Sequence, residues 1–273
     1  MISSLQPDII IGTETHIDSS ISDSEFLPLN YKAHRRDRNK HGGGVLIALK
    51  DDLFTNSIRL QELETDCEIL WVKLTTKDSS NLYICSYYRP HVSDETSLNS
   101  FALSLQKACS KDKRRVVIAG DLNFPDWDWS RMVLKQPSSH ARLHKDLYDH
   151  LQDHGLDQLV TDPTRGDNTL DLVITNVPYL VPRLHTIPGL SDHDAVFFEL
   201  KSRVTRNQKK PHKILLYNKA NFDEMKKDLL DTTATVNKLN DEKKSIDELW
   251  VTFENDLKNS IEKHIPSKMS SAK

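Results

Sequence analysis

The 273-residue sequence has no apolar run close to the roughly 20 residues that a membrane-spanning helix needs. Its first residues, Met1 to Leu5, lack the basic and apolar segments of a secretory signal peptide. Cysteine is scarce: Cys67, Cys85 and Cys109 lack metal-type spacing, which argues against a disulfide framework and favours a reducing compartment. These absences predict an intracellular protein without a membrane span.

A strong charge excess is also missing. Lys and Arg number 37 against 40 Asp and Glu, for a formal net charge of -3, so any affinity for nucleic acid must come from local patches. Two basic runs, residues 35–41 and 201–213, supply such patches. No repeat occurs at a fixed period, and no Gly-x-Ser-x-Gly motif accompanies the lipase-like run His41–Gly44. A solenoid, a propeller and an α/β-hydrolase are therefore excluded.

The sequence does contain short buried strands and amphipathic helices. Apolar runs bounded by turn residues predict strands, and apolar spacing near 3.6 residues predicts helices. Strands are expected at residues 7–12, 31–34, 45–49, 68–75, 82–88, 116–119, 170–175, 184–187 and 195–200. Helices are expected at residues 98–110, 143–154, 222–230 and 246–265. This order of elements indicates a layered α/β domain.

One stretch organises the expected chemistry. The apolar run Val116–Ala119 predicts a buried strand, Gly120 predicts a turn, and Asp121 and Asn123 follow it directly. Side chains two residues apart at the end of a strand point the same way. The stretch therefore offers one charged and one neutral oxygen to a shared point, which suits a hard cation or a phosphate-bound water.

Chemically capable side chains also accompany the other expected strands. Glu14 follows the first strand, Tyr88 ends another, Asp171 lies within one, and Ser191, Asp192 and His193 precede the last. Strand ends gather at one edge of an α/β domain, so these side chains should lie close together. A cluster of Glu14, Asp121, Asn123 and Asp192 would be strongly anionic and would need a divalent cation, with all-oxygen ligation favouring magnesium or manganese over zinc. His193 needs an acid to orient it.

The ordered motifs resemble the endonuclease/exonuclease/phosphatase superfamily, which includes DNase I and AP endonucleases. The resemblance covers about residues 7–200, and its most specific parts are Gly120–Asn123 and Ser191–His193, with Glu14 upstream. Further details are similar to the endonuclease domain of non-LTR (LINE-type) retrotransposons. They are residues 42–48, 87–90, 162–165 and 170–176.

The resemblance implies a four-layer α/β sandwich of two packed mixed sheets flanked by helices. It also implies metal-dependent hydrolysis of DNA phosphodiesters, with Mg²⁺, or Mn²⁺, as cofactor. Residues 1–202 would form this domain, and residues 203–273 a basic linker and helical extension toward a reverse transcriptase. The family's first strand, which ends in asparagine, has no counterpart before Pro7, so we expect this chain to lack it. Work on chromosomal DNA would require access to the nucleus.

The resemblance also implies roles for individual residues. Glu14 would be the main metal ligand, Asp192 a second metal or water contact, and Asp121 the group that orients or deprotonates the attacking water while also contacting the metal. Asn123 would hold the phosphate or the water, Tyr88 would donate to the phosphate, and His193, oriented by Asp171, would stabilise its charge. Thr164 and Ser191 would make backbone or phosphate contacts, and Arg89 a contact with phosphate or DNA.

Two other interpretations stay open. One is a phosphatase or phospholipase-type enzyme of the same fold, acting on inositol phosphates or sphingomyelin. The other is a degenerate, non-catalytic domain that binds nucleic acid. Trp127 and Trp129 fit either stacking on bases or packing on the core.

Overall fold

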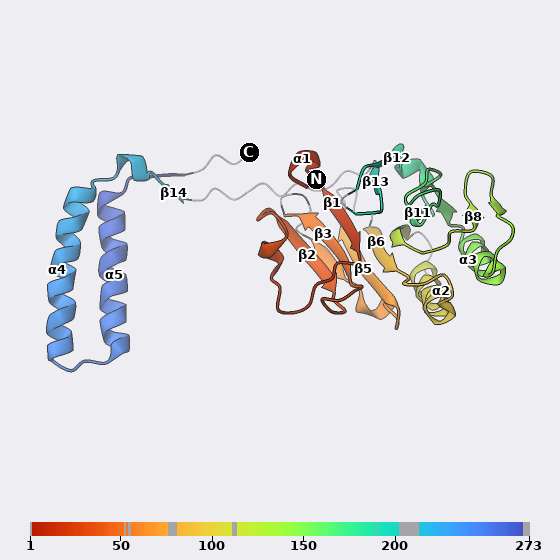
Figure 1. Cartoon of the computed structure of the whole chain (residues 1–273). Helices are drawn as coiled ribbons and strands as arrows, with labels where there is room; N and C mark the ends of the chain where they lie inside the picture. The colour runs from red at the N-terminus through yellow and green to blue at the C-terminus, as the bar shows by residue number, and fades with distance from the viewer. Residues whose placement is uncertain are drawn as a thin grey trace. The chain divides into compact units, whose positions relative to one another are not determined.

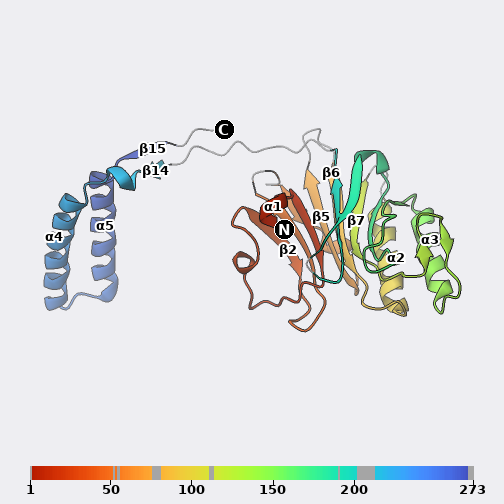
Figure 2. The ribbon, with the colours of Figure 1, turned by 45° about the horizontal axis from the view of Figure 1, so that its top comes forward.

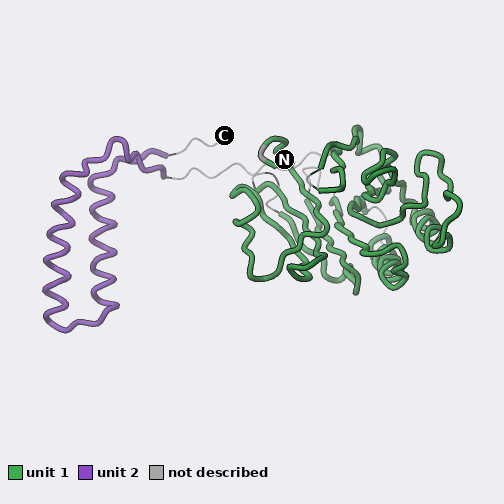
Figure 3. Tube along the Cα trace, viewed as in Figure 1, with its two compact units in different colours: residues 1–207 green, residues 208–273 purple. Residues whose placement is uncertain are grey.

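The computed structural model describes residues 2–51, 53, 56–75, 81–110, 114–189, 191–201 and 213–269. The chain divides into two compact units, Met1–Asn207 and Gln208–Lys273 (Figure 3). The linker expected at residues 201–213 falls almost entirely outside the described residues.

The first unit contains two main sheets. The smaller is antiparallel, with the order β1–β3–β2, and consists of β1 (Ile9–Thr13), β3 (Val45–Lys50) and β2 (Tyr31–Arg36). The larger has the order β10–β11–β7–β6–β5–β4, formed by β10 (Asp157–Gln158), β11 (Asp171–Thr175), β7 (Arg115–Asp121), β6 (Asn81–Tyr88), β5 (Glu68–Thr75) and β4 (Ser57–Arg59). Strands β6 and β7 are parallel and the other pairs are antiparallel, so this sheet is mixed.

Smaller elements complete the unit. Two hairpins are formed by β12 (Arg183–Ile187) with β13 (Ala195–Glu199) and by β8 (Trp127–Asp128) with β9 (Val133–Leu134). Short 3-10 helices are η1 (Asp23–Glu25), η2 (Gln61–Leu63) and η3 (Pro178–Leu180). The two-residue strands β8, β9 and β10 and the three-residue β4 were not expected from the sequence, because so few residues carry no periodicity.

The core has two apolar layers, one on each face of the larger sheet. Between the sheets, Ile47 of β3 packs with Val72 of β5 and Ile84 of β6. The opposite face is covered by α2 (Glu95–Cys109) and α3 (Ala141–Asp153) (Figure 2). In this layer Phe101 of α2 stacks on Tyr87 of β6, with ring centroids 4.3 Å apart. The alternation of apolar residues along β5 and β6 thus serves both layers.

The outer face of the smaller sheet is covered differently. Leu46 and Ala48 of β3 pack there with Phe26 and Leu27 of an irregular segment and with Ile2 of the one-turn helix α1 (Ile2–Leu5) (Figure 1). The predicted mixed α/β fold with packed sheets is confirmed. Its fourth layer is made by α1 and the irregular segment with Phe26 and Leu27, and not by long helices.

The second unit is a helical hairpin of α4 (Phe222–Asp241) and α5 (Ile246–His264). At its open end, β14 (Lys213–Leu215) pairs with β15 (Ser267–Met269), and the 3-10 helix η4 (Tyr217–Lys219) leads into α4. Helix α4 runs beyond the expected residue 230 through a threonine-rich stretch that has little apolar pattern. None of the helices in the described part of the chain has the length and apolar character needed to cross a membrane.

Candidate active site

The end of β7 is shaped by Gly120. This glycine has φ of 149°, and a Cβ atom there would lie 2.0 Å from the carbonyl oxygen of Tyr87. Only glycine allows β7 to pass so close to β6. The strand ends at Asp121, whose side chain is buried.

Asn123 fixes the carboxylate of Asp121 but does not simply continue the strand. Its φ is 52°, so it lies in the left-handed region and breaks the alternation that the sequence predicted. Its backbone N–H donates to Asp121 Oδ1 at 3.0 Å, and its side-chain Nδ2 donates to Asp121 Oδ2 at 3.2 Å and to the Arg89 carbonyl at 2.8 Å. Asn123 thereby holds both oxygens of Asp121 in place.

Asp171 and His193 form the expected pair. Asp171 opens β11 directly opposite Asp121 in the register of β7 and β11. Its Oδ2 lies 2.7 Å from His193 Nδ1, and the two side chains are each 21% exposed. An acid therefore orients the imidazole beside the buried carboxylate of Asp121.

Thr164 is a positioning residue for this pair. It is buried, and its Oγ1 accepts from the backbone N–H groups of Leu170 and Asp171, each at 3.0 Å. Its carbonyl oxygen accepts from the N–H of Asp194 at 2.7 Å, which ties down the turn that carries His193. Of the backbone and phosphate contacts expected of Thr164, the described residues provide backbone contacts.

Glu14 reaches the site from the turn after β1. It accepts a hydrogen bond from Tyr88 at the end of β6, and its φ is 50°. The turn is held by the glycine segment before β3: Thr15 N–H donates to the Gly44 carbonyl at 3.3 Å, and His16 N–H to the Gly43 carbonyl at 3.0 Å. The run of glycines thus supports the position of Glu14.

Electrostatics link these side chains into what we call the carboxylate–histidine cluster: Glu14, Asp121, Asp171 and His193. Burial, followed by the negative charge of Asp171, raises the pKa of Asp121 to about 7, with a further contribution from Glu14. The hydrogen bond that His193 donates to Asp171 raises the pKa of His193. Burial and then Glu14 raise the pKa of Tyr88, so its hydroxyl stays protonated and can donate.

Asp192 lies apart from the other carboxylates. It pairs with Arg165 Nη2 at 2.5 Å, and both side chains are at least half exposed. Ser191 is also exposed, and its Oγ accepts from the His193 N–H at 3.3 Å. The structure gives Asp192 no contact with Glu14 or Asp121 among the described residues, so the four-ligand anionic cluster expected from the sequence is not assembled.

The donor set fits a hard cation with few protein ligands. No group of three or more His, Cys, Asp or Glu side chains in the described ranges is arranged to hold a metal. Glu14 and Asp121 nevertheless supply carboxylate oxygens, and their crowding with Asp171 makes the site electron-rich. Magnesium is commonly held by one or two carboxylates together with substrate phosphates.

Arg89 is not placed to make the phosphate or DNA contact that was expected of it. It is fully buried, and its guanidinium donates to the carbonyls of Val92, Asp94, Leu122 and Asn123 while lying 4.1 Å from the ring centroid of Phe124. The hydrogen bonds of Arg89 therefore hold the segment after β7, and its buried guanidinium is not available to DNA.

The tryptophans and the first basic run are also mostly structural. Trp127 and Trp129 are buried, and Trp127 stacks on Tyr148 with centroids 5.0 Å apart, so they pack on the core. Arg35 is held by Asp23 and Asp37 at 2.7 and 2.6 Å. Arg36 donates to two backbone carbonyls, leaving less of this run for a ligand.

Two arginines near the cluster were not singled out from the sequence. Arg165 pairs with Asp192, and its positive charge partly opposes the rise in the pKa of His193. Arg38 pairs with Glu68 at 2.7 Å, and its charge partly opposes the rise in the pKa of Tyr88. Both side chains are 40–50% exposed. Arg165 lies in the Asp162–Arg165 motif, which was the signal available for it.

Comparisons with known proteins agree with the fold. Residues 82–197 match a sequence family described as endonuclease–reverse transcriptase. The fold is similar to that of the 3′ phosphatase NExo from Neisseria, solved with a product DNA hairpin, at a TM-score of 0.56 and 12% identity, covering 73% of this chain and 91% of that one. The fold is also similar to that of an endonuclease/exonuclease/phosphatase family protein from Leptotrichia buccalis, at a TM-score of 0.50 and 13% identity, covering 73% of this chain and 89% of that one. No curated protein sequence matches. The expected resemblance to the superfamily is confirmed at the level of the fold and of this family match, while the closer resemblance to non-LTR retrotransposon endonucleases stays a prediction.

Proposed function

We propose that this chain, whose fold is that of the endonuclease/exonuclease/phosphatase superfamily, hydrolyses phosphodiester bonds in DNA. The observation that carries the proposal is the His193–Asp171 pair beside the buried carboxylate of Asp121. An acid with a pKa near 7 can accept a proton at neutral pH, and a histidine held by an acid keeps its proton to higher pH. A base and a charge-stabilising donor in one cluster suit in-line attack of water on phosphorus.

Each member of the cluster then has a distinct task. Asp121, with both oxygens held by Asn123, orients the water and takes its proton. His193 donates from its second ring nitrogen to a phosphoryl oxygen, where negative charge develops, and Asp171 keeps the ring in that orientation. Tyr88 stays protonated and donates its one hydroxyl proton to Glu14, and it would donate to the phosphate once the substrate displaces that bond.

Glu14 and Asp121 would hold a divalent cation, with Mg²⁺ the preferred ion and Mn²⁺ an alternative. When bound, such an ion neutralises the crowded carboxylates and polarises the phosphate. Asp192 joins this set only if its pairing with Arg165 opens, so we assign it a secondary contact.

DNA is proposed as the substrate of an endonuclease domain from a non-LTR retrotransposon, with a reverse transcriptase in the same element as partner. The family matched by residues 82–197 is described by that combination, and NExo is a DNA-bound phosphatase. Arg165, Arg38 and Lys40 are half-exposed cations on the described surface near the site or its supporting loop. If they track phosphates, affinity for DNA falls steeply with salt.

Nicking of supercoiled plasmid in Mg²⁺ tests the proposal. We expect Asp121→Ala and His193→Ala to lower the nicking rate by about 100-fold or more, because each removes a group used in proton transfer or charge stabilisation. Exposed Asp153→Ala and half-buried His150→Ala, both on α3, are the matched controls and should nick at the parent rate. Equal nicking by all four variants would show that the site is elsewhere.

A non-catalytic, nucleic-acid-binding role is the second candidate. Two observations favour it: Asp192 is paired with Arg165, and the described residues contain no group of three or more His, Cys, Asp or Glu side chains arranged to hold a metal. In that case the parent chain would bind DNA but neither nick plasmid nor release phosphate from a 3′-phosphorylated DNA hairpin. Phosphate release without nicking would instead indicate the phosphatase alternative.

A further inference from the structure

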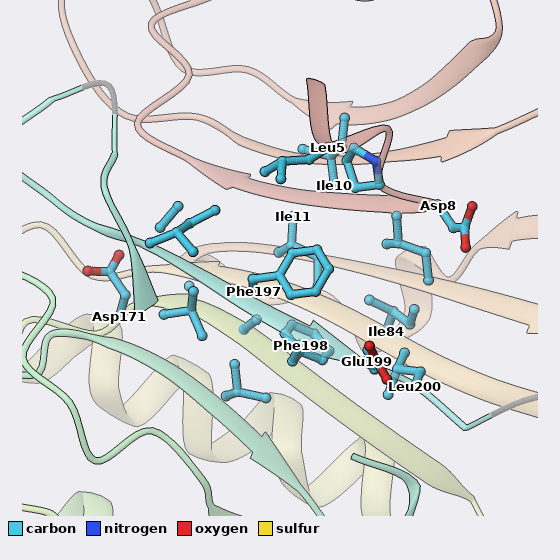
Figure 4. Close-up of a pocket in the computed structure, with 18 of the residues that line it drawn as sticks. Leu5, Asp8, Ile10, Ile11, Ile84, Asp171, Phe197, Phe198, Glu199 and Leu200 are labelled. Atoms are coloured by element: carbon cyan, nitrogen blue, oxygen red, sulfur yellow. The ribbon is translucent and has the colours of Figure 1, made fainter. Parts of the chain in front are cut away.

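The end of β7 is packed differently on the two sides of the larger sheet. Toward the smaller sheet, Gly120 and Asp171 line a cavity of about 700 Å³ (Figure 4). Toward α2 and α3, the residues that follow the strand include Leu122 and Phe124, which are buried in the apolar layer. The position of Asp121 therefore depends mainly on packing from the side of the helices.

His144 of α3 is a buried titratable residue on that side of the sheet, and the proposed mechanism does not use it. Its side chain is 0% exposed. Its Nδ1 lies 2.9 Å from the carbonyl oxygen of His140, and its Nε2 lies 3.1 Å from the backbone nitrogen of Asp126. A carbonyl oxygen accepts and a backbone N–H donates, so the ring donates from Nδ1 and accepts at Nε2. This geometry fixes His144 as the neutral tautomer with its proton on Nδ1.

A continuous set of contacts joins His144 to the candidate active site. Its ring packs edge-to-face with Phe124, with centroids 5.1 Å apart and planes at 83°. The guanidinium of Arg89 lies 4.1 Å from the centroid of Phe124 and donates to the carbonyl of Asn123 at 3.2 Å. The side chain of Asn123 in turn donates to the carbonyl of Arg89 and to Oδ2 of Asp121. A displacement of Phe124 would therefore reach the carboxylate of Asp121 through two residues.

Protonation of His144 would break one of these contacts. Nε2 would no longer accept from the Asp126 N–H, and its new proton would point toward Asp126 Oδ2, which is 4.0 Å away and already accepts from Ser138. Burial lowers the pKa of His144, as do the charges of Arg89 and His140, while the hydrogen bond to the His140 carbonyl and the charge of Asp126 act against this shift. The ring is therefore neutral at pH 7 and above.

We propose that neutral His144 is a positioning residue for Asp121, acting through the contacts described above. This role rests on the proposed function of Asp121 as the base, but the contacts themselves need neither substrate nor metal. A histidine that only filled space under α3 would be replaced by an apolar side chain of similar volume without effect on the site. A positioning histidine needs its acceptor for the Asp126 N–H.

Three variants of the full chain separate positioning from packing. His144→Gln keeps one donor and one acceptor but does not titrate, His144→Leu keeps neither, and Leu147→Ala removes a buried apolar side chain from the same helix. In plasmid nicking at pH 8, at a temperature where all are folded, we expect His144→Leu to lower the maximal rate by about tenfold or more. The other two should stay within about threefold of the parent. Equal losses in His144→Leu and Leu147→Ala would overturn the proposal, because both would then act through packing.

The acid limb of the nicking-rate profile gives a second readout. Below the pKa of Asp121, which is about 7, protonation of the base lowers the rate in every variant. Below the pKa of His144 the parent should lose rate more steeply, by about one further power of ten per pH unit, whereas His144→Gln should not. Acid limbs of equal steepness in the parent and in His144→Gln would contradict the assignment.

The side-chain amide of Asn123 tests the coupling without any activity. Because this amide donates to Arg89 and to Asp121, its NMR shifts report how the carboxylate is held. In chains labelled with ¹⁵N-asparagine, in EDTA and without DNA, we expect His144→Leu to displace these resonances and His144→Gln to leave them at the parent positions. His144→Gln also removes the imidazole ring, so it controls for the ring's own effect on the shifts. Unmoved resonances in His144→Leu, or equal movement in both variants, would overturn the positioning role. The expected pattern in a chain that fails to nick plasmid would support that role and overturn the proposed function alone.

Discussion

At the scale of single residues, the buried carboxylate of Asp121 makes the sharpest prediction. Its pKa of about 7 in the folded chain lies well above the ordinary value of 3.8. Below pH 4 the carboxyl is protonated in both states. Between pH 4 and 7 the unfolded chain releases the proton while the folded chain keeps it, so Asp121 lowers stability progressively as pH rises. Asp121→Asn, which cannot ionise, should therefore be more stable than the parent at pH 8, by up to about 4 kcal/mol.

Thermal unfolding from pH 4 to 8 in EDTA measures this difference. The gap in unfolding temperature between Asp121→Asn and the parent should be small at pH 4 and should widen up to pH 7. The exposed control Asp153→Asn should show no such trend. A gap that is the same at every pH would mean that Asp121 is not the titrating group.

The second residue-scale prediction concerns the acid that orients His193. Because the hydrogen bond that His193 donates to Asp171 raises the pKa of His193, the imidazole stays protonated to higher pH in the parent. Asp171→Asn removes that charge, so the alkaline limb of the nicking-rate profile should move to lower pH and the maximal rate should fall by about two orders of magnitude. A lower rate with an unmoved limb would assign Asp171 a purely structural role.

Residue identity alone predicted part of this site. The sequence brought Asp121, Asp171, His193, Glu14 and Tyr88 to one sheet edge, and the structure joins them by hydrogen bonds and mutual charge effects. The family resemblance implied a phosphate or DNA contact for Arg89 and a backbone or phosphate contact for Thr164. Tertiary packing buries both side chains, and their polar groups form hydrogen bonds with the backbone instead.

At the scale of elements, the close approach of β7 to the end of β6 depends on Gly120. In Gly120→Ala the new Cβ atom would collide with the Tyr87 carbonyl, and φ of 149° strains any other residue. We expect a loss of at least about 3 kcal/mol of unfolding free energy. Gly12→Ala in β1 is the matched control, since its Cβ atom would meet Leu46 no closer than 3.6 Å and should change stability by less than about 1 kcal/mol.

Urea unfolding of both variants measures the contrast. A Gly120→Ala chain as stable as Gly12→Ala would mean that β7 can shift away from β6 without cost. We further expect Gly120→Ala to nick plasmid more slowly even at temperatures where it is folded, because any shift of β7 moves Asp121.

The longer elements were predictable and the shorter ones were not. Strands such as Glu68–Thr75 and helices such as Ala141–Asp153 carry several periods of apolar pattern, so the sequence places them within a few residues. Strand β4 and the hairpin of β8 and β9 form only because neighbouring elements offer partners. The extension of α4 past residue 230 follows from pairing with α5, which a local apolar pattern does not encode.

At the scale of the whole molecule, the apolar core belongs to the first unit. The three apolar clusters found among the described residues draw all their members from residues 2–200. The helical hairpin of the second unit buries few side chains, and Trp250 in α5 is 61% exposed. The apolar core that stabilises the first unit is therefore built within residues 2–200.

We predict that residues 1–207 fold without the rest of the chain. Calorimetry should give a main unfolding temperature within about 3 °C of the full chain, because the truncation removes no member of the apolar clusters. Leu105→Ala, which opens a cavity under α2, should lower that temperature equally in both lengths, with a cost of about 2–5 kcal/mol. A larger loss in the truncated chain would show that residues 208–273 contribute to the stability of the first unit, and the nicking assay on the same pair would then report whether they also support the site.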